Sequence, residues 1–369
     1  MMKVLHFILG KASKDRPNGV NQVIAGLAKY STRHGAQVRV IGKAQTVERE
    51  GQRITRDGFE VEAYSCWRGP LVKALVEAIE WADLVHLHGV YAPWNLWVSR
   101  LCRRAGRPFV ITLHDGLSPE RALVKGRIKK RVFHELFQKS YLQKAAAVHV
   151  LTEEEGTDLW ACARPRRVFC IPNGVDLEDF PQFERRSIGD KANLVLGYLG
   201  RLSPEKNLDA FCRAFAAVNT DGCFRLQLAG PDSDYARALV RQFGAQGVEW
   251  VGPRYGEAKT AFIRSLDLFI MPSLSEGFSI AAIEVLALGT PLLITRTAKA
   301  CYFYNSQAFF MCEPTTFGLE RGLRMAVDRR NDWPVMATRG RTLIEDRLNW
   351  SVVARDMLSA YAECVGGDR

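Results

Sequence analysis

The sequence predicts an α/β protein made of two doubly wound domains, each with a mostly parallel sheet between layers of helices. Three observations lead to this prediction. The chain has 369 residues, which suits two domains at roughly 150 residues each. Short apolar runs typical of buried strands alternate with amphipathic helical stretches. The alternation stops in a polar stretch at residues 181–190 and restarts at Leu194, which indicates a linker.

The apolar runs of strand length define the expected sheets. In the first part of the chain they are Val4–Leu9, Gln37–Gly42, Leu84–His88, Phe109–Leu113, Ala147–Leu151 and Val168–Ile171. After residue 190 they are Leu194–Leu199, Phe224–Ala229, Val248–Val251, Leu268–Met271 and Pro291–Ile294. Apolar residues at helical spacing predict helices over Asn21–Arg33, Leu208–Val218 and Trp350–Cys364.

These elements predict a first domain over residues 1–180 and a linker over 181–193. A second domain follows over 194–345, and a C-terminal segment over 346–369. In doubly wound domains, ligands bind beyond the carboxyl ends of the strands. The loops that follow strands are therefore the expected places for chemistry.

Composition excludes several classes of protein. Hydrophobic residues make up 47% and charged residues 25% of the chain, which is ordinary for a globular protein and excludes a disordered or collagen-like one. No apolar run approaches the roughly 18 to 20 residues of a membrane span, and the N-terminus lacks the pattern of a signal peptide. Nine cysteines without a Cys-x-x-Cys pair argue against disulfides and a zinc ribbon and favour the cytoplasm.

Positive charge is concentrated in one region. The net charge is +11, and residues 101–150 alone contain 11 Lys and Arg against three Asp and Glu. The segment Arg121–Lys144 mixes basic residues with apolar ones at helical spacing, and Trp94–Arg104 does so over a shorter length. Such segments lie on an anionic membrane surface, or they are surface helices whose apolar stripe packs on the core. The sequence leaves both interpretations open.

Two loops have the residue types that bind phosphate. Arg201 and Lys206 lie five residues apart in the loop after the strand Leu194–Leu199, and two such cations suit a diphosphate. Asn18-Gly19 precedes a helix after the first strand. Glycine allows a close backbone approach to an anion, although Asn-Gly is also common in ordinary turns.

The segment 272–291 has an unusual pair of carboxylates. Glu276 stands in a loop, and Glu284 lies inside the apolar helix expected over Ile280–Leu288. A carboxylate in apolar surroundings is costly unless it has a partner, and a sugar diol is a good one because a carboxylate accepts two hydroxyl hydrogen bonds. Free amides at the start of this helix suit a phosphate, and they belong to Phe278, Ser279 and Ile280.

These segments together resemble the retaining glycosyltransferases of family 4, which have the GT-B fold. The Glu-x7-Glu pattern from Glu276 to Glu284, followed by Gly289-Thr290-Pro291, carries most of the resemblance. Gly200-Arg201-Leu202 with Lys206-Asn207, Ile171–Asp176 and Val85–Gly89 are similar to other motifs of the family, in its order. The resemblance covers nearly the whole chain.

The resemblance implies two Rossmann-like domains that face each other across a cleft, the first for the acceptor and the second for the nucleotide sugar. It also implies that the C-terminal helix, within residues 346–369, crosses back to the first domain. Arg201 and Lys206 would neutralise the donor diphosphate as it leaves. Glu276 would bind hydroxyls of the donor sugar, and Glu284 would hold the ribose. Three further matches complete the expected site: His114 as the active-site histidine, Gly19 in the phosphate loop, and Arg254 in the segment that frames the base. His88, at a strand end, is expected on the acceptor side.

The resemblance implies that a hexose-type sugar is transferred from a donor of the GDP-mannose or UDP-hexose class. Retention in the family is explained by front-face attack, so neither a metal nor another cofactor is expected. The basic, aromatic first domain favours a lipid-linked saccharide acceptor, on the inner face of the cytoplasmic membrane, in lipopolysaccharide, capsule or exopolysaccharide synthesis. Two alternatives stay open: a GT-B nucleotide-sugar epimerase, which needs no acceptor, and a non-enzymatic polyanion binder. A nucleic-acid partner is not expected, since it would leave Glu276 and Glu284 unexplained. Such a partner would be recognised by salt-dependent binding to duplexes.

Several other residues invite a metal interpretation. His86 and His88 lie on one strand face and would bind a metal with His114, or they pack in the core. Asp232-Ser233-Asp234 is a metal motif or a turn after a strand. His149 is expected to pack within its strand. From Thr295 the chain departs from the family's pattern, so the sequence predicts no architecture between there and the last helix.

Overall fold

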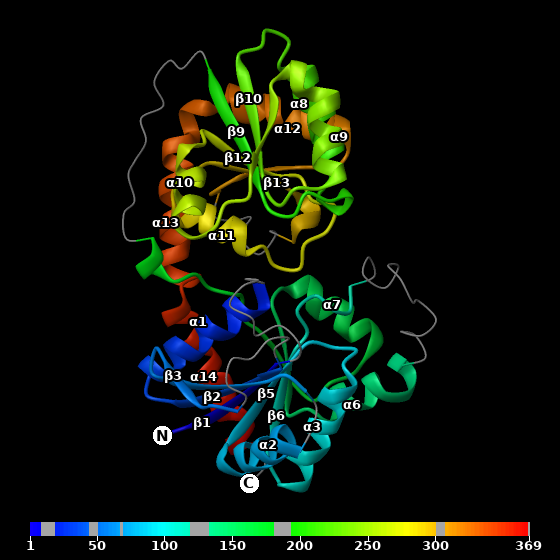
Figure 1. The fold of residues 1–369 in the computed structure, drawn as a ribbon, viewed down its shortest axis with the longest axis vertical. Coiled ribbons are helices and arrows are strands. Elements are labelled where there is room, and N and C mark those ends of the chain that lie inside the picture. The colour runs from blue at the N-terminus through cyan, green and yellow to red at the C-terminus, as the bar shows by residue number, and fades with distance from the viewer. Residues whose placement is uncertain are drawn as a thin grey trace. The chain divides into compact units, whose positions relative to one another are not determined.

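The computed structural model describes residues 1–8, 19–43, 51–66, 69–118, 133–180, 193–299 and 307–367. The chain forms two compact units, one of residues 1–174 and 350–369 and one of residues 175–349, and each is considered by itself (Figure 1). The expected linker lies almost wholly outside the described residues, as do Asn18 and residues 121–132 of the basic segment.

The boundaries of the two units differ from the expected domain boundaries. Residues 175–180, expected in the first domain, belong to the second unit. They do so because Val175 pairs with Asn349 and donates its N–H to the carbonyl of Leu348 at 2.9 Å. The C-terminal return to the first unit begins at Trp350, a few residues later than the expected 346.

The first unit contains an eight-stranded sheet in the order β3-β4-β2-β1-β5-β6-β7-β8. All neighbours are parallel except the β3–β4 pair. The strands are β1 (Lys3–Ile8), β2 (Gln37–Lys43), β3 (Ile54–Arg56), β4 (Phe59–Tyr64), β5 (Leu84–His88), β6 (Phe109–Thr112), β7 (Ala147–Val150) and β8 (Val168–Cys170). All six expected strands of this part are confirmed. β3 and β4 were not expected, because β3 is fully exposed and β4 alternates with charged residues.

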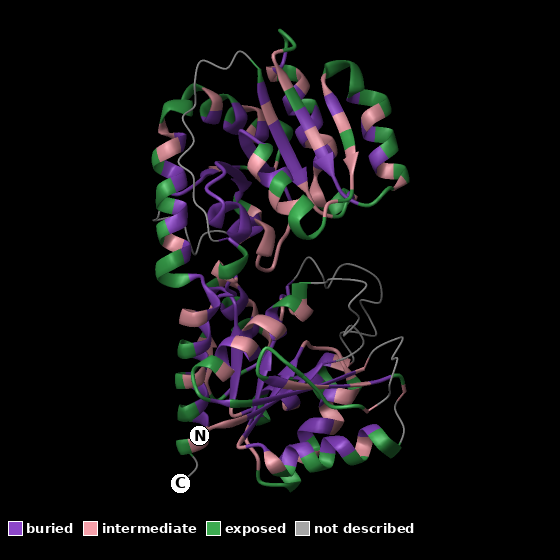
Figure 2. Ribbon diagram, turned by 60° about the vertical axis from the view of Figure 1, so that its left-hand side comes forward, coloured by how far each residue is buried: buried purple, intermediate pink, exposed green. Residues whose placement is uncertain are grey.

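Helices cover both faces of this sheet. They are α1 (Gly19–Arg33), α2 (Gly69–Trp81), α3 (Pro93–Arg104), α6 (Lys139–Lys144), α7 (Glu153–Cys162) and α14 (Trp350–Gly366), with a π-helical turn η1 (His134–Gln138) before α6. One sheet face packs against α2, α3, α6 and α7. The other packs against α1 and against Leu358 of α14. Figure 2 shows the result as largely buried strands between helices of mixed exposure.

The second unit contains six parallel strands in the order β11-β10-β9-β12-β13-β14. This is the order of a Rossmann sheet, in which the direction of winding reverses between the first and fourth strands. The reversal here lies between β9 and β12. The strands are β9 (Leu194–Leu199), β10 (Phe224–Ala229), β11 (Val248–Gly252), β12 (Leu268–Met271), β13 (Leu292–Thr295) and β14 (Phe310–Cys312).

Two apolar cores flank this second sheet. One face packs on α8 (Leu208–Val218), α9 (Asp234–Phe243) and α12 (Thr316–Asp328). The other packs on α10 (Gly256–Ser265), α11 (Ile280–Ala287) and α13 (Trp333–Arg347). The region without a sequence prediction therefore completes the fold: β14 adds an edge strand, and α12 and α13 each cover one face. Among the helices of the described residues, none is long and apolar enough to cross a membrane.

A close contact between α1 and α14 depends on a glycine. A Cβ atom added to Gly26 would lie 2.3 Å from the indole of Trp350, so only glycine lets these two helices approach. We predict that Gly26→Ala lowers the free energy of unfolding by about 1–3 kcal/mol through overpacking, although alanine is the better helix former. Urea unfolding of the whole chain measures the loss. Gly69→Ala is the matched control, because nothing lies within 4 Å of the added methyl group; an equal effect of both substitutions would contradict the packing explanation.

Candidate active site

Two loops of the second unit meet where the winding of its sheet reverses. Residues 200–207 follow β9 and residues 272–279 follow β12, and β9 and β12 are neighbouring parallel strands. The backbone N–H of Leu274 donates to the carbonyl of Glu205 at 3.1 Å. The side-chain amide of Asn207 donates to the carbonyl of Pro272 at 3.1 Å. The loop that contains both predicted cations is thus fixed against the loop that contains Glu276.

Lys206 and Glu276 form a close ion pair within these loops. Lys206 Nζ lies 2.6 Å from Glu276 Oε1, and the two side chains are only 13% and 19% exposed. The hydroxyl of Ser273 donates to the same carboxylate oxygen at 2.8 Å. The sequence predicted that both charged residues belong to the site. It predicted neither their direct contact nor the hydrogen bond from Ser273. A ligand that carries both phosphate and hydroxyl groups can exchange with this pair, since the ammonium suits the former and the carboxylate the latter.

Arg201 presents its charge to solvent beside this pair. Its side chain is 75% exposed, and its guanidinium lies 3.4 Å from Glu205. The backbone carbonyl of Arg201 accepts a hydrogen bond from the hydroxyl of Tyr198 at 3.1 Å, and burial raises the pKa of Tyr198. Tyr198 thus stays protonated and anchors the backbone from which the exposed guanidinium extends.

Glu284 is buried on α11 and has a partner that the sequence did not indicate. It is 8% exposed, and its Oε1 atom lies 2.7 Å from Nζ of Lys259 on α10. Burial raises the pKa of Glu284, while the Lys259 ammonium acts in the opposite direction. The expectation that this carboxylate needs a partner is confirmed. That partner is a lysine, 25 residues away in sequence, and such a separation leaves no pattern to recognise.

α11 begins at Ile280, as the sequence predicted. Ser279 is the N-cap, and its hydroxyl accepts from the N–H of Ala282 at 3.3 Å. Phe278, Ser279 and Ile280 are all half-buried. Arg254 follows β11, is half-buried, and donates to the carbonyl of Pro253 at 3.2 Å. The contribution of these residues to ligand binding stays a prediction.

In the first unit, His114 lies on a strained turn after β6. His114 and Asp115 have φ angles of 51° and 60°, a left-handed conformation that costs energy for residues other than glycine. Glu155, only 2% exposed, accepts from the N–H of Asp115 at 2.5 Å and from that of Leu151 at 2.6 Å. This glutamate, which the sequence did not indicate, fixes the turn. Outliers of this kind concentrate at functional sites.

The histidines at the end of β5 lie in the core. His88 is 5% exposed, and its two ring nitrogens contact His6 and His114. Its contact with an acceptor stays a prediction. His86 contacts Tyr361 of α14 and Thr112 of β6. Gly19 is the first residue of α1 and is exposed.

Two of the metal interpretations change with the structure. The histidines with metal-like proximity in the described part of the chain are His6, His86 and His88, whereas the sequence had grouped His114 with the last two. Asp232 and Asp234 both pair with Arg237, and Ser233 between them caps α9. The interpretation of this segment as a turn after a strand is therefore confirmed.

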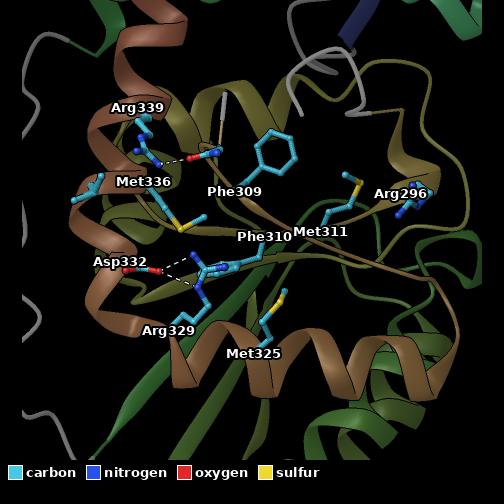
Figure 3. Close-up of a pocket in the computed structure, with 11 residues that line it drawn as sticks. Arg296, Phe309, Phe310, Met311, Met325, Arg329, Asp332, Met336 and Arg339 are labelled. Carbon is cyan, nitrogen blue, oxygen red and sulfur yellow. Dashed lines mark hydrogen bonds and ion pairs between the residues drawn. The ribbon is translucent and has the colours of Figure 1, made fainter. Parts of the chain in front are cut away.

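A pocket of about 620 Å³ lies elsewhere in the second unit, between β14, α12 and α13 (Figure 3). None of the predicted site residues lines it. Its arginines already have acidic or amide partners, as Figure 3 shows for Arg329 with Asp332. Arg339 donates to the side-chain oxygen of Gln307 at 2.8 Å. The third, Arg296, pairs with Glu313 at 3.0 Å. The pocket is therefore separate from the candidate active site.

Comparisons with known proteins agree with the fold and with the family resemblance. Residues 17–179 match the model of Glycosyltransferase Family 4, and residues 193–316 match that of Glycosyl transferases group 1. A GDP-mannose:cellobiosyl-diphosphopolyprenol alpha-mannosyltransferase of Xanthomonas campestris is 29% identical over 290 residues, which cover 76% of this chain and 72% of the relative. A D-inositol 3-phosphate glycosyltransferase of Actinosynnema mirum is 30% identical over 233 residues, which cover 57% and 55%.

Solved structures show the same fold at lower identity. Sucrose-phosphate synthase of Thermosynechococcus elongatus superposes with a TM-score of 0.77 at 15% identity, over 100% of both chains. HepE of Anabaena in complex with UDP-glucose superposes with a TM-score of 0.74 at 19% identity, over 98% of this chain and 100% of its own.

The Lys259–Glu284 pair gives a testable dependence of stability on pH. We predict that Lys259→Met lowers the free energy of unfolding by about 3 kcal/mol at about pH 8, because it leaves an uncompensated buried carboxylate. Folding raises the pKa of Glu284, so protonation of Glu284 stabilises the folded state. This stabilisation is complete below the ordinary carboxyl pKa and is lost as the pH rises through the raised pKa of the folded state.

The deficit of the Lys259→Met variant should therefore nearly vanish at about pH 4 and grow toward pH 8. Chemical unfolding across this range measures it. Lys259→Arg, which keeps the charge, is the control and should lose less at every pH. A deficit that does not change with pH would mean that the Glu284 carboxylate is not the source of the loss.

Proposed function

Because the chain belongs to the family 4 glycosyltransferases and has their GT-B fold, we propose that it transfers a hexose from a nucleotide diphosphate donor with retention of configuration. The observation that carries this proposal is the Lys206–Glu276 pair beside the exposed Arg201. It places two cations and a carboxylate at the reversal point of a Rossmann sheet, where such folds bind nucleotides.

The chemistry of the donor explains why these residue types are needed together. Breaking the bond between sugar and diphosphate leaves positive charge on the sugar and negative charge on the leaving group. Arg201 and Lys206 would stabilise the leaving diphosphate, as fixed cations do in a preorganised site. Glu276 would accept hydrogen bonds from the sugar hydroxyls, and Glu284 from those of the ribose. The start of α11, at Ser279 and Ile280, would add amides aimed at a phosphate.

We further propose front-face attack without a metal ion. Glu276 is held by an ammonium and a hydroxyl, so its surroundings favour a fixed hydrogen-bond acceptor rather than a nucleophile. A departing phosphate oxygen can instead take the proton of the acceptor hydroxyl. The two cations supply the charge that a divalent metal supplies in other transferases. His114, on its strained turn, would face the donor sugar.

GDP-mannose is our first choice of donor, and UDP-hexoses are the second. The Xanthomonas campestris relative is named for a transfer from GDP-mannose to a diphosphopolyprenol-linked sugar, and HepE was solved with UDP-glucose. We propose an acceptor of the lipid-linked saccharide class, in the synthesis of lipopolysaccharide, capsule or exopolysaccharide on the cytoplasmic side of the membrane.

Exposed apolar residues in the first unit support a membrane surface. Leu136 and Phe137 of η1 are 64% and 43% exposed, and Trp160 of α7 is 53% exposed. These elements adjoin, since the ring of His134 contacts the carbonyl of Cys162 at 3.1 Å, and Lys139 follows in the chain. The other expected segment offers less support. In α3, Leu96, Trp97 and Leu101 are partly buried against the core, which favours the surface-helix interpretation there.

The donor is tested by a thermal-shift panel of UDP, GDP, ADP and their common sugar conjugates on the full chain, with and without EDTA. We predict that one nucleotide family, with GDP first, raises the melting temperature by several degrees, as ligand binding to the folded state requires. Glu284→Ala should weaken that shift. Glu257→Ala, which removes an exposed glutamate of α10, is the matched control and should leave the shift unchanged.

No shift with any nucleotide, or an equal shift in both variants, would contradict this assignment of the donor site. Loss of the shift in EDTA would contradict metal independence. Sugar release or isomerisation at full rate without any acceptor would favour the epimerase alternative instead.

The membrane surface is tested by sedimentation with lipid vesicles. We predict that the chain binds vesicles of phosphatidylcholine and phosphatidylglycerol, and binds phosphatidylcholine alone several-fold less, because basic segments are attracted to anionic lipid. Leu136→Ser combined with Trp160→Ser should reduce the bound fraction. Phe317→Ser, at a 68% exposed site of the second unit, is the control. Equal failure to bind both kinds of vesicle would refute the proposed surface.

A further inference from the structure

Three histidines form a hydrogen-bonded chain that leads from the turn of His114 into the core of the first unit. His88 Nδ1 lies 3.1 Å from His114 Nε2. His88 Nε2 lies 3.0 Å from His6 Nδ1. The rings of His88 and His114 are nearly parallel, at 28°, with their centroids 5.3 Å apart. His6 is on β1 and His88 on β5, the two strands at which the winding of the first sheet reverses.

The inner two histidines are neutral. His6 is fully buried and His88 is 5% exposed. Burial lowers the pKa of His6 to about 3 and holds that of His88 well below its ordinary value. A neutral imidazole has one N–H and one bare nitrogen. Since His88 contacts a ring nitrogen on each side, it donates to one neighbour and accepts from the other.

The inner end of the chain favours one of the two directions. His6 Nε2 is buried and has no hydrogen-bond partner within the residues that the structure describes. A buried N–H without a partner is rarer than an under-satisfied acceptor, so this nitrogen is the bare one. His6 then donates through Nδ1 to His88, and His88 donates through Nδ1 to Nε2 of His114. It follows that a neutral His114 has its proton on Nδ1.

A divalent metal does not fit these histidines, although His6, His86 and His88 lie close together. His86 is already occupied, because its nitrogens lie 2.6 Å from the hydroxyl of Tyr361 and 2.6 Å from that of Thr112. Both ring nitrogens of His88 are likewise engaged, by its two neighbours in the chain of histidines. The geometry is that of a hydrogen-bond network that links the sheet to α14.

We propose that His88 is a positioning residue that sets the tautomer and ring orientation of His114, with His6 fixing the direction of the chain behind it. The backbone of His114 is held by Glu155 through the adjacent Asp115. Its ring is contacted at Nε2 by His88, from the end of β5. The effect on catalysis rests on the proposed function, in which His114 faces the donor sugar. The tautomer of His114 does not depend on that function.

The first test reads the tautomer directly. Long-range ¹H–¹⁵N spectra of the full chain, labelled with ¹⁵N-histidine, distinguish a protonated Nδ1 from a protonated Nε2. We expect His114, assigned by its loss in His114→Gln, to show the Nδ1–H tautomer alone. A wild-type His114 with its proton on Nε2, or a mixture of both tautomers, would overturn the proposal, and this measurement requires no folded variant of His88.

The second test uses two variants of similar size. His88→Asn places an amide N–H near the position of Nδ1 and so preserves the donor to His114, whereas His88→Gln reaches the position of Nε2 and so faces His6. We expect His88→Asn to retain the tautomer of His114 and most of kcat. His88→Gln should give mixed tautomers and a kcat about 10- to 100-fold lower, the scale of a misplaced catalytic group. Affinity for the nucleotide should be unchanged in both, because Lys259 and Glu284 belong to the second unit.

The outcomes separate the proposal from the proposed function. Identical tautomers and identical rates in the two His88 variants would overturn the positioning role. One equivalent of zinc in the native chain, found by elemental analysis and lost in His6→Gln, would replace it by a metal site. A single Nδ1–H tautomer in a protein that turns over no nucleotide sugar would support the chain of histidines and contradict the transferase.

Discussion

The arrangement of the candidate site depends on the parallel pairing of β9 with β12. Parallel neighbours end at the same edge of a sheet, and this pair is where the winding reverses, so no crossover helix covers the edge between them. The loops after the two strands therefore meet, and one backbone hydrogen bond and one side-chain hydrogen bond, each of 3.1 Å, join them. Glycine is needed next to this edge, because a Cβ on Gly230 would lie 2.1 Å from the carbonyl of Gly200. Lys206 and Glu276 approach each other as a consequence of the topology.

Charge is buried in this protein where a partner is available, and each case costs stability. Glu284 is placed on an apolar helix and is neutralised by Lys259. Glu276 is neutralised by Lys206. Removing one partner of such a pair lowers stability by more than the intact pair adds. Stability alone therefore does not explain why the pairs are present, whereas a use in the site does. In the proposed function, the carboxylates exchange ammonium partners for sugar hydroxyls. The first unit also buries an ion pair, since Nη2 of Arg39 lies 2.6 Å from Oε1 of Glu62. In the chain of histidines it buries uncharged polar groups.

The strands and long helices were predictable because their periodicity is strong. α8 spans Leu208–Val218 as expected, and all the expected strands of the second unit are present. β3 and β4 escaped because β3 is an exposed edge strand and β4 alternates apolar residues with charged ones, so neither has an apolar run. In the site, the charged residues could be predicted because charged side chains are unusual in apolar surroundings. Lys259 and Glu155 were not, since they lie 25 and 40 residues from the residues that they contact, and such separations leave no local pattern. Ser273 lies only three residues from Glu276, but a serine in a polar loop does not by itself indicate the contact.

The most direct test of the proposed site compares nucleoside diphosphate with monophosphate. Calorimetric titration of the full chain with GDP and GMP, or with UDP and UMP, isolates the contribution of the second phosphate. The proposed role of Lys206 predicts that the diphosphate binds at least about tenfold more tightly, which corresponds to about 1.4 kcal/mol, and that Lys206→Met removes most of this advantage. Equal affinities for the two nucleotides in the wild type, or an advantage that survives the substitution, would contradict the assignment of Lys206 to the leaving diphosphate.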